Sequence, residues 1–336
     1  MSPNVLITAG SRRVALVEAF RRAMRELRLG GAVIVTDVND LSPAVHVADR
    51  ACEVSLSTAP TYLDEIAEIC DVEGVDLLIP TIDEELPLFG DAIDAFSEQG
   101  VTVFSSVRRT AEQCNDKFVT SDVLRAHGVP AAVSYLPDTL PAEPVFPLFV
   151  KPRLGRGSVA AFAVQNAREL AFFLEYVDDP IVQEYLDGPE YTIDLLCDLG
   201  GRPISIVPRE RLVIRAGVSD RGRTVDDPAL TDVALACADA FEFRGAVNIQ
   251  CRVRDGRATI FEINPRYSGG IPLTIAAGAD FPKLMLEMTL GRRVEPALGQ
   301  FEAGLCMTSY EATLFIEPAG RRPLRRCEPH SLREAV

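Results

Sequence analysis

Hydrophobic and polar positions form a repeating pattern over the first hundred residues. Short apolar runs, each followed by a polar turn, predict strands at 5–8, 33–36, 75–79 and 101–104. Apolar residues at helical spacing predict a helix after residue 13 and further helices at 61–72 and 84–98. Strands that alternate with helices are typical of a parallel sheet covered on both faces. We therefore expect an N-terminal α/β domain over residues 1–115.

The pattern changes after residue 115, where a helix predicted at 116–127 is followed by a proline-rich loop. Apolar runs then outnumber helical segments, and the predicted strands are 148–151, 159–164, 181–184, 191–197, 203–207, 246–252 and 258–263. The turn pairs Gly200-Gly201 and Asp255-Gly256 predict hairpins. We expect an α+β region over 116–316 with a mainly antiparallel sheet, divided at about 186, and a solvated tail over 317–336.

Composition and charge narrow the class of protein. A chain of 336 residues that is 47% hydrophobic and 25% charged is expected to fold into two or three globular domains. Its net charge of −15 disfavours a nucleic-acid partner, which would need a basic surface. Eight cysteines without a Cys-x-x-Cys pair favour reduced thiols, and no apolar run is long enough for a membrane helix. We expect a soluble, cytoplasmic protein without a membrane partner.

The segment Phe261-Glu262-Ile263-Asn264 is a candidate metal site. Alternate strand residues share a face, so Glu262 and Asn264 are predicted to point together, while Phe261 and Ile263 face the core. The turn at 255–256 would bring Gln250 across from Glu262. Carboxylate and amide oxygens suit Mg²⁺ bound together with phosphate oxygens. The alternative, about equally weighted from spacing alone, is a pair of ordinary half-buried strands.

A second candidate is the segment 149–158, where Lys151 ends a strand just before a glycine-bearing loop. Glycines let backbone N–H groups approach phosphate oxygens, and Lys151 would supply a positive charge. The plain alternative is a simple hairpin turn. Farther along, the predicted strand 181–186 ends in a loop. The backbone at this strand end could offer N–H and C=O groups to a purine, and Glu190 could accept hydrogen bonds from ribose hydroxyls.

Taken together and in this order, these motifs resemble the ATP-grasp superfamily. The residues that carry the resemblance are Lys117, Lys151 with its glycine loop, Gln183-Glu184-Tyr185-Leu186, Glu190, Gln250 and Glu262-Ile263-Asn264-Pro265-Arg266. The chain is most similar to one ATP-grasp unit of the carbamoyl-phosphate synthetase large subunit and to stand-alone carboxylate–amine ligases. The resemblance implies an ATP-grasp fold: an N-terminal parallel α/β domain, a small lid subdomain at about 118–186 and a C-terminal, mainly antiparallel sheet domain at about 187–316.

The resemblance also implies roles for individual residues. The ATP-binding residues would be Lys117, Lys151, Gly155, Gly157, Ser158, Gln183, Glu184, Tyr185, Leu186 and Glu190. Gln250, Glu262 and Asn264 would hold two Mg²⁺ ions, with Mn²⁺ as an alternative. Lys151 and Arg266 would be the catalytic residues, Arg266 by contacting the transferring phosphoryl group or the acyl phosphate.

The sequence departs from the synthetase pattern at one informative point. That pattern has Arg-x-Ser-Arg after the Asn-Pro pair, whereas here Ser268 is followed by Gly269-Gly270. The chain also has one ATP-grasp unit where the synthetase needs two. Both departures favour ligation of a carboxylate larger than bicarbonate.

We therefore expect an ATP-dependent carboxylate–amine ligase that forms an amide through an acyl phosphate and releases ADP and phosphate. The alternatives are a carbamoyl-phosphate-synthetase-like enzyme and an ATP-dependent small-molecule kinase. A distant alternative is an NAD-dependent oxidoreductase, suggested by the strand, glycine loop and helix before Asp37, although one glycine stands where that fingerprint needs three. The expected partners are small molecules, and a homodimer is left open.

The organic substrate is expected at the carboxyl edge of the N-terminal sheet, approached by arginines from the C-terminal domain. The candidate substrate residues are Ser11, Arg12, Arg13, Asp83, Glu84, Arg209, Arg215 and Ser268. Arginines and helix N–H groups attract anions, whereas the acids attract an amine, so a zwitterion such as an amino acid is favoured. The alternative for Ser11 and Asp83 is helix capping.

Overall fold

The computed structural model describes residues 2–155, 157, 159–317 and 324. Its contacts divide the chain into two compact units. Among the described residues, the first unit comprises 2–108, 280–295 and 310–317, and the second comprises 109–279 and 296–309. The chain thus returns to the first unit after leaving it. The expected domain limits themselves stay a prediction.

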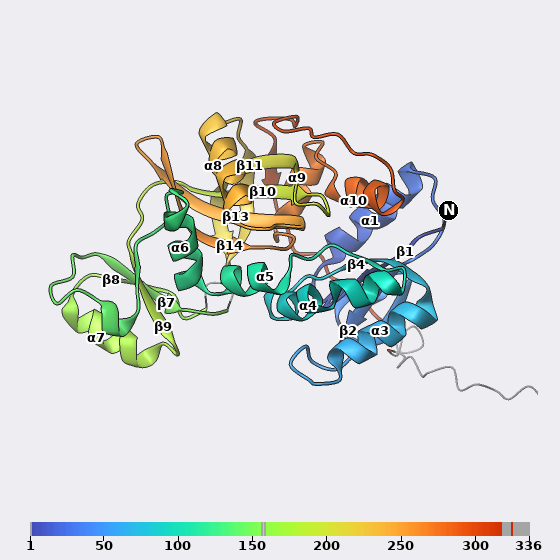
Figure 1. Ribbon diagram of the computed structural model, residues 1–336, viewed down its shortest axis with the longest axis horizontal. Coiled ribbons are helices and arrows are strands. Elements are labelled where there is room, and N and C mark those ends of the chain that lie inside the picture. Colours follow the sequence, from blue (N-terminus) through green and yellow to red (C-terminus); the bar gives the residue numbers. More distant parts are fainter. Residues whose placement is uncertain (1, 156, 158, 318–323, 325–336) are drawn as a thin grey trace, which may run out of the picture. The chain divides into compact units, whose positions relative to one another are not determined.

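The first unit is built on a five-stranded parallel sheet with the order β3-β2-β1-β4-β5 (Figure 1). The strands are β1 (Asn4–Ile7), β2 (Val33–Asp37), β3 (Arg50–Glu53), β4 (Val75–Ile79) and β5 (Thr102–Val103). The helices are α1 (Val14–Glu26), α2 (Pro43–Val47), α3 (Tyr62–Glu73), a 3-10 turn η1 (Asp83–Glu85), α4 (Leu86–Glu98) and α10 (Phe281–Thr289). Apolar residues of α3 and α4 pack with Leu6, Ile34 and Leu78 of the sheet. The predicted parallel α/β domain is confirmed.

A small antiparallel sheet forms the lid of the second unit (Figure 1). Its strands are β6 (Ser134–Tyr135), β7 (Leu148–Pro152), β8 (Phe162–Val164) and β9 (Pro180–Glu184), in the order β6-β9-β7-β8. The helix α7 (Ala167–Tyr176) packs on it through Leu170 and Phe173. A short 3-10 turn, η2 (Pro137–Thr139), follows β6.

A six-stranded antiparallel sheet forms the rest of the second unit, in the order β14-β13-β10-β11-β12-β15. The strands are β10 (Glu190–Cys197), β11 (Pro203–Arg215), β12 (Val218–Thr224), β13 (Gly245–Arg254), β14 (Arg257–Asn264) and β15 (Cys306–Thr308). The helices are α5 (Arg108–Asn115), α6 (Lys117–Ala126), α8 (Pro228–Ala240) and α9 (Ile271–Ala276). One face of the sheet is apolar, and Ile193, Ile249 and Ile263 pack there against α6 and α8. Because strand residues alternate, the other face carries the polar residues of β10, β13 and β14.

Both predicted hairpins are confirmed, and Gln250 pairs with Glu262 as expected. The prediction that Phe261 faces the core with Ile263 is wrong, because the Phe261 side chain lines a pocket. The register between β13 and β14 shifts after this pair, so that Cys251 lies opposite Ile260 and Phe261 is an extra residue. Such a β-bulge re-aims a side chain, which explains the reversal.

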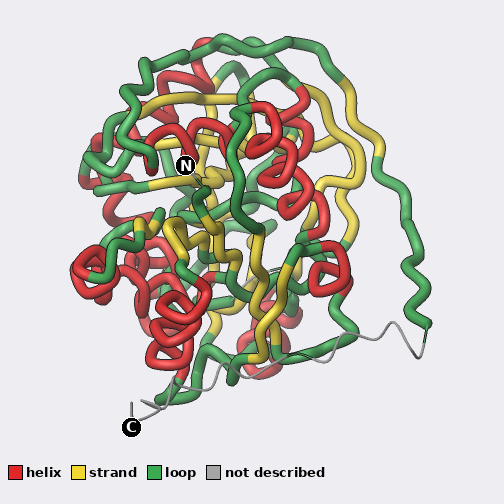
Figure 2. The backbone as a smooth tube through the Cα atoms, turned by 90° about the vertical axis from the view of Figure 1, so that its right-hand side faces the viewer, coloured by secondary structure: helices red, strands yellow, loops and turns green. Residues whose placement is uncertain are grey.

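Several elements were not predicted from the hydrophobic pattern, among them β12, whose sequence Val-Ser-Asp-Arg-Gly-Arg-Thr is almost entirely polar. It forms by pairing with β11 and β15 rather than by burying an apolar face. After β15 the described chain continues to residue 317 without helix or strand (Figure 2). Within the described residues, no helix is both long and apolar enough to cross a membrane.

The carboxyl group of Glu85 is a buried polar centre in the first unit. It accepts hydrogen bonds from Thr8 Oγ1 (2.8 Å), Tyr62 OH (2.6 Å) and Thr81 N (2.7 Å). Burial raises the pKa of Glu85, and these hydrogen bonds oppose the rise. Glu85→Ala would leave three buried donors without an acceptor, so we expect the free energy of unfolding to fall by about 3–5 kcal/mol. Urea denaturation measures it.

The matched control is Glu98→Ala, because Glu98 is exposed at the end of α4. We expect it to change the unfolding free energy by less than about 0.5 kcal/mol. Equal effects of the two substitutions would contradict the role assigned to Glu85.

Candidate functional site

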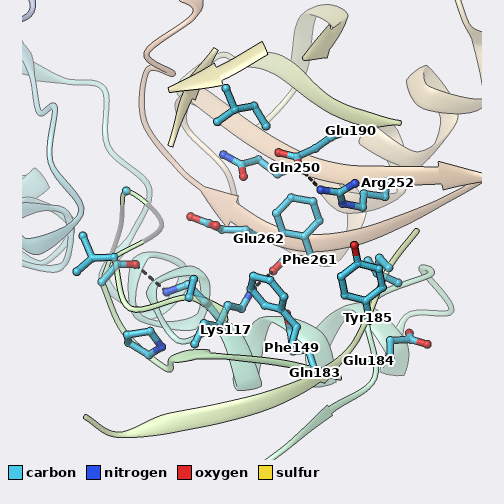
Figure 3. A pocket seen from close by; sticks show the side chains of 18 of the residues that line it. Lys117, Phe149, Gln183, Glu184, Tyr185, Glu190, Gln250, Arg252, Phe261 and Glu262 are labelled. Atoms are coloured by element: carbon cyan, nitrogen blue, oxygen red, sulfur yellow. Dashed lines mark hydrogen bonds and ion pairs between the residues drawn. The ribbon is translucent and has the colours of Figure 1, made fainter. Parts of the chain in front are cut away.

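One pocket of about 410 Å³ lies in the second unit, between the lid strands and the polar face of the large sheet (Figure 3). It brings together the predicted residues Lys117, Lys151, Gly155, Gly157, Gln183, Glu184, Tyr185, Leu186, Glu190, Gln250 and Glu262. Lys117 and Glu262 lie toward one end, and Tyr185 and Glu184 lie toward the other. Ser158, also predicted, falls outside the described residues. A cleft of this size suits a small-molecule ligand.

Lys151 is buried at the floor of this pocket. Its Nζ donates to the backbone oxygen of Phe261 (3.2 Å) and lies 5.4 Å from the centre of that ring. The β-bulge therefore supplies both the apolar wall and the acceptor that hold the lysine. Burial lowers the pKa of Lys151 to about 8, while the Glu262 carboxylate opposes the fall and Lys117 adds to it. A buried cation of this kind is suited to meet an anion that enters the pocket.

Lys117 is the first residue of α6 and connects this helix to the glycine loop. Its Nζ donates to the backbone oxygen of Gly155 (2.7 Å). The preceding residue, Asp116, caps the helix by accepting from two backbone N–H groups and also pairs with Arg153 Nη2 (2.6 Å). The described part of the loop is thus attached to α6 by a lysine and by an ion pair.

Glu190 joins two arginines at the upper wall of the pocket (Figure 3). Its two carboxylate oxygens accept from Arg211 Nη1 (2.6 Å) and Arg252 Nη2 (2.7 Å). Arg211 also donates from Nη2 to the backbone oxygen of Gly217 (2.6 Å). Burial lowers the pKa of Arg211, and Glu190 opposes that fall. Each carboxylate oxygen has a second lone pair, so Glu190 can still accept from a ligand hydroxyl.

The hairpin that joins β11 to β12 touches the glycine loop. A Cβ atom on Gly217, whose φ is +74°, would lie 2.9 Å from the Cα atom of Gly157. Only glycine permits both this left-handed conformation and so close an approach. The loop and Arg211 are therefore linked through the backbone of Gly217.

The far end of the pocket presents a strand edge. Gln183 Nε2 donates to Ser134 Oγ (2.7 Å), and the backbone N–H of Glu184 donates to Val133 O (2.9 Å). The Glu184 carboxylate accepts from Val133 N (2.9 Å), so this side chain fixes the edge. The backbone of Tyr185 and Leu186 continues along the pocket beyond the last paired residue of β9.

Sequence reasoning did not identify several lining residues. Phe149, Phe261 and Ile214 form apolar walls suited to a flat ring, and Arg252 pairs with Glu190. Arg252 could have been found, because it follows Gln250 by two residues and therefore shares its face of β13. Phe261 could not, because its direction depends on the bulge.

Three oxygen-bearing side chains meet at the metal-binding candidate. Gln250 lies opposite Glu262, and Asn264 Nδ2 donates to Glu262 Oε1 (3.0 Å). Arg266 Nη2 donates to Asn264 Oδ1 (3.3 Å), which places the predicted catalytic arginine beside this set. The described residues contain no group of three or more His, Cys, Asp or Glu side chains that could hold a metal. One carboxylate with two amides fits a hard cation that takes its other ligands from phosphate and water.

The N-terminal substrate candidates have internal partners. The N–H of Ser11 donates to Asp37 Oδ2 (2.6 Å), and Arg13 Nη2 donates to Thr81 O (2.9 Å), whereas Arg12 is exposed. The capping alternative is wrong for Ser11, because Arg13 is the N-cap of α1. It is also wrong for Asp83, because that residue begins η1. Short turns precede α1 and α4, and the spacing of apolar residues in the sequence does not predict them.

The remaining substrate candidates, including Glu84, do not line the described pocket. Arg215 is exposed at the tip of the β11–β12 hairpin, where its Nη2 lies 3.7 Å from Asp220. Arg209 is fully buried, and its Nη2 donates to Ser268 Oγ (3.0 Å).

Two family models match different parts of the chain. Residues 5–104 match the PylC-like N-terminal domain, and residues 177–313 match the ATP-grasp domain of a biosynthetic pathway with the Ter operon. The arginine-specific large chain of carbamoyl phosphate synthase from Bacillus subtilis (strain 168) is 24% identical over 270 residues. That match covers 74% of this chain, which spans only about a quarter of that relative.

Solved structures show the same fold. The L-amino acid ligase from Bacillus licheniformis superposes with a TM-score of 0.67 at 19% identity, covering 86% of this chain and 74% of that one. The biotin carboxylase domain dimer of Hydrogenobacter thermophilus 2-oxoglutarate carboxylase, complexed with MgADP, ADP and bicarbonate, gives 0.69 at 17% identity, covering 90% and 73%. The chain belongs to the ATP-grasp superfamily and is similar to the carbamoyl phosphate synthase large chain, and it shares its fold with the L-amino acid ligase. The predicted superfamily and fold class are confirmed.

Proposed function

We propose that this protein is an ATP-dependent carboxylate–amine ligase that forms an amide through an acyl phosphate. The observation that carries the proposal is the pocket, in which Lys151 and Lys117 face Glu262 and Gln250 at one end. The phosphate chain of a nucleotide requires positive charges that neutralise it directly and a metal ion that bridges its oxygens. The two lysines would supply the charges, and the side-chain oxygens of Glu262 and Gln250 would bind the metal.

In the proposed complex the nucleotide follows the length of the pocket. Lys151 and Lys117 hold the phosphates beneath the glycine loop, and Glu190 accepts from the ribose. The edge formed by Tyr185 and Leu186 receives the adenine between apolar walls. MgADP in the related carboxylase domain supports this arrangement.

Gln250, Glu262 and Asn264 would hold Mg²⁺, which screens the phosphate charges when it is bound. Arg266, which donates to Asn264 Oδ1, would stabilise negative charge on the transferring phosphoryl group. A carboxylate oxygen of the acid attacks the γ-phosphorus and ADP leaves. The amine then attacks the acyl carbon, phosphate leaves with the carbon–oxygen bond electrons, and the nitrogen loses a proton. The closed pocket would protect the acyl phosphate from water.

The rival functions differ in what happens to the phosphoryl group. A small-molecule kinase would leave it on the product, and a carbamoyl-phosphate-synthetase-like enzyme would start from bicarbonate. The L-amino acid ligase fold match favours an organic acid. An NAD-dependent oxidoreductase is disfavoured, because one glycine stands where its fingerprint needs three and residues 177–313 match an ATP-grasp family model. The domain dimer among the relatives supports a homodimer as part of the proposal.

The function is tested by a phosphate-release screen of carboxylic acids crossed with amines, with products read by mass. The expected positive is an acid–amine pair that releases ADP and phosphate and yields a product with the summed mass less one water. A stable phosphorylated product would establish the kinase instead. ATP turnover with bicarbonate as the only acid would favour the synthetase-like alternative.

The depressed pKa of Lys151 predicts a pH dependence of ATP binding. In the free protein the lysine loses its proton near pH 8, whereas bound phosphates would raise its pKa toward the ordinary value. ATP binding at pH 8.5 should therefore take up roughly half to one proton, and almost none at pH 6.5. Affinity should fall as pH rises above 8. Calorimetry in two buffers of different ionisation enthalpy measures the uptake.

Lys151→Met is the control for this experiment, since it removes the titrating group. Residual ATP binding by that variant should show no comparable proton uptake at pH 8.5. Equal uptake by both proteins would assign the proton to another group.

A further inference from the structure

Arg211 is buried at the base of the β11–β12 hairpin, where it contacts three parts of the site. Its Nη1 donates to Glu190 Oε1 (2.6 Å) and Gln250 Oε1 (3.4 Å), and its Nη2 donates to Gly217 O (2.6 Å). The Nε atom donates to Ser219 Oγ (3.2 Å) on β12. One guanidinium therefore joins the candidate ribose contact, a candidate metal ligand and the hairpin backbone.

Neutralising Glu190 does not require Arg211. The other carboxylate oxygen, Oε2, accepts from Arg252 Nη2 (2.7 Å), and Arg252 Nη1 donates to Gly188 O (2.8 Å). Figure 3 shows Glu190 and Arg252 together on the polar face of the large sheet. A second, buried guanidinium has a desolvation cost that its own contacts must offset. Among the described residues, Arg211 but not Arg252 joins Glu190 to the hairpin.

The tip of this hairpin has little packing of its own. Residues 212–216 are all exposed, and the register between β11 and β12 shifts twice just after Arg211. Segments with few buried contacts change position at a low free-energy cost, so a polar contact at the base of the hairpin can set where its tip lies. Gly217 at the tip lies directly against the backbone of Gly157. The hairpin is therefore a physical link between Arg211 and the glycine loop.

We propose that Arg211 is a positioning residue that couples the ribose contact at Glu190 to the glycine loop. A ribose hydroxyl that donates to Glu190 fixes the carboxylate, and the carboxylate fixes the guanidinium through Nη1. The Nη2 atom then holds Gly217, and with it the hairpin tip, against Gly157. Recognition of the ribose thus stabilises the backbone that covers the phosphates. This inference rests on the proposed nucleotide complex, which it extends by a role for Arg211.

Arginine suits this role because its guanidinium is a planar fork that holds two N–H groups in a fixed relation. A lysine at the same position would keep the charge, but its single nitrogen does not hold Glu190 and Gly217 in a fixed relation. Arg211→Lys therefore separates the coupling from the charge. Arg252→Lys is the matched control variant, since it makes the same replacement at the other oxygen of the same carboxylate.

The coupling is tested by hydrogen exchange on the full chain with saturating Mg²⁺ and either ATP or 2′,3′-dideoxy-ATP, with no acid or amine present. These nucleotides have the same base and phosphates and differ only in the hydroxyls from which Glu190 would accept. In the wild type, the backbone amides of residues 212–218 should exchange at least ~5-fold more slowly with ATP than with the dideoxy nucleotide. Equal exchange rates would overturn the proposal.

The two lysine variants then assign the effect to Arg211. Arg211→Lys should show the same hairpin exchange with both nucleotides, whereas Arg252→Lys should keep the difference between them. An arginine that only pairs its charge with Glu190 would make the two variants behave alike, and that result refutes the coupling. If Arg211→Lys does not fold, Gly217→Ala decides, because its Cβ atom would force the exposed tip away from Gly157. An undiminished difference in that variant would equally refute the link.

The coupling and the proposed function fail in different ways. Calorimetry that detects no ATP binding by the wild type would refute the nucleotide site and the coupling together. ATP binding with equal hairpin exchange under both nucleotides would refute the coupling alone. A difference in exchange that is lost only in Arg211→Lys, with no acid–amine pair ligated, would keep the coupling and contradict the ligase.

Discussion

Glu262→Gln is expected to reduce ATP turnover at saturating Mg²⁺ by at least ~10²-fold, the loss typical for removal of one electrostatic contact to the reacting charge. Glu262 is the one carboxylate among the three candidate metal ligands, so its replacement leaves only neutral amides. The substitution keeps the shape of the side chain and an oxygen for Asn264 Nδ2, now 3.0 Å from Glu262 Oε1. The fold should therefore persist, and steady-state phosphate release measures the loss.

The control is Glu242→Gln, which removes an exposed carboxylate elsewhere in the second unit. It should leave turnover within about twofold of the wild type, since isolated surface charges contribute little. Wild-type turnover by Glu262→Gln would refute the metal assignment. A higher Mg²⁺ requirement with partial activity would support it.

Lys151→Met is expected to weaken ATP binding by at least ~10²-fold while preserving or raising stability, because charge-assisted contacts to phosphate are lost but no buried charge remains. A pKa lowered from 10.5 to about 8 means that the folded protein binds this proton less tightly than the unfolded chain does. Below pH 8 the buried charge therefore costs stability, on the order of 3 kcal/mol. That cost disappears as pH rises from 8 to 10.5.

Methionine has nearly the same length and no charge, so it removes this cost at pH 7. Urea denaturation and calorimetry with ATP measure the two effects separately. Lys283→Met is the matched control, since Lys283 is the third of only three lysines and lies in the first unit. It should not change ATP affinity. A large loss of stability in Lys151→Met would contradict the assignment of Lys151 as a ligand-binding cation.

Local pattern and motif order were sufficient for the architecture and for most of the pocket. The alternation of short apolar runs with helical spacing predicted the parallel sheet, because burial on both faces requires continuous apolar strands. The turn at Asp255-Gly256 fixed the pairing of Gln250 with Glu262, since a tight turn leaves little freedom of register. These features depend on residues close together in the chain.

Contacts between distant segments decided the rest. The bulge at Phe261 turned a predicted core residue into the wall and acceptor for Lys151, which no period-two pattern could show. The sequence shows that Gly270 departs from the synthetase motif but gives no structural reason for a glycine there. Only the fold shows that it makes room for the guanidinium of Arg209, which lies 61 positions earlier in the chain.

The sequence by itself thus determined the superfamily, the sheet types and the ends of the nucleotide pocket, because these follow from local hydrophobic spacing and from motifs read in order. The tertiary structure decided which polar groups are already paired and which are not. The carboxylates of Glu184 and Asp37 accept hydrogen bonds from backbone N–H groups. By contrast, one side-chain oxygen of Asp194 and one of Asn248 are buried without a hydrogen-bond partner among the described residues. Hydrogen-bond satisfaction depends on partners from several strands at once, so it is a property of the assembled sheet rather than of any segment.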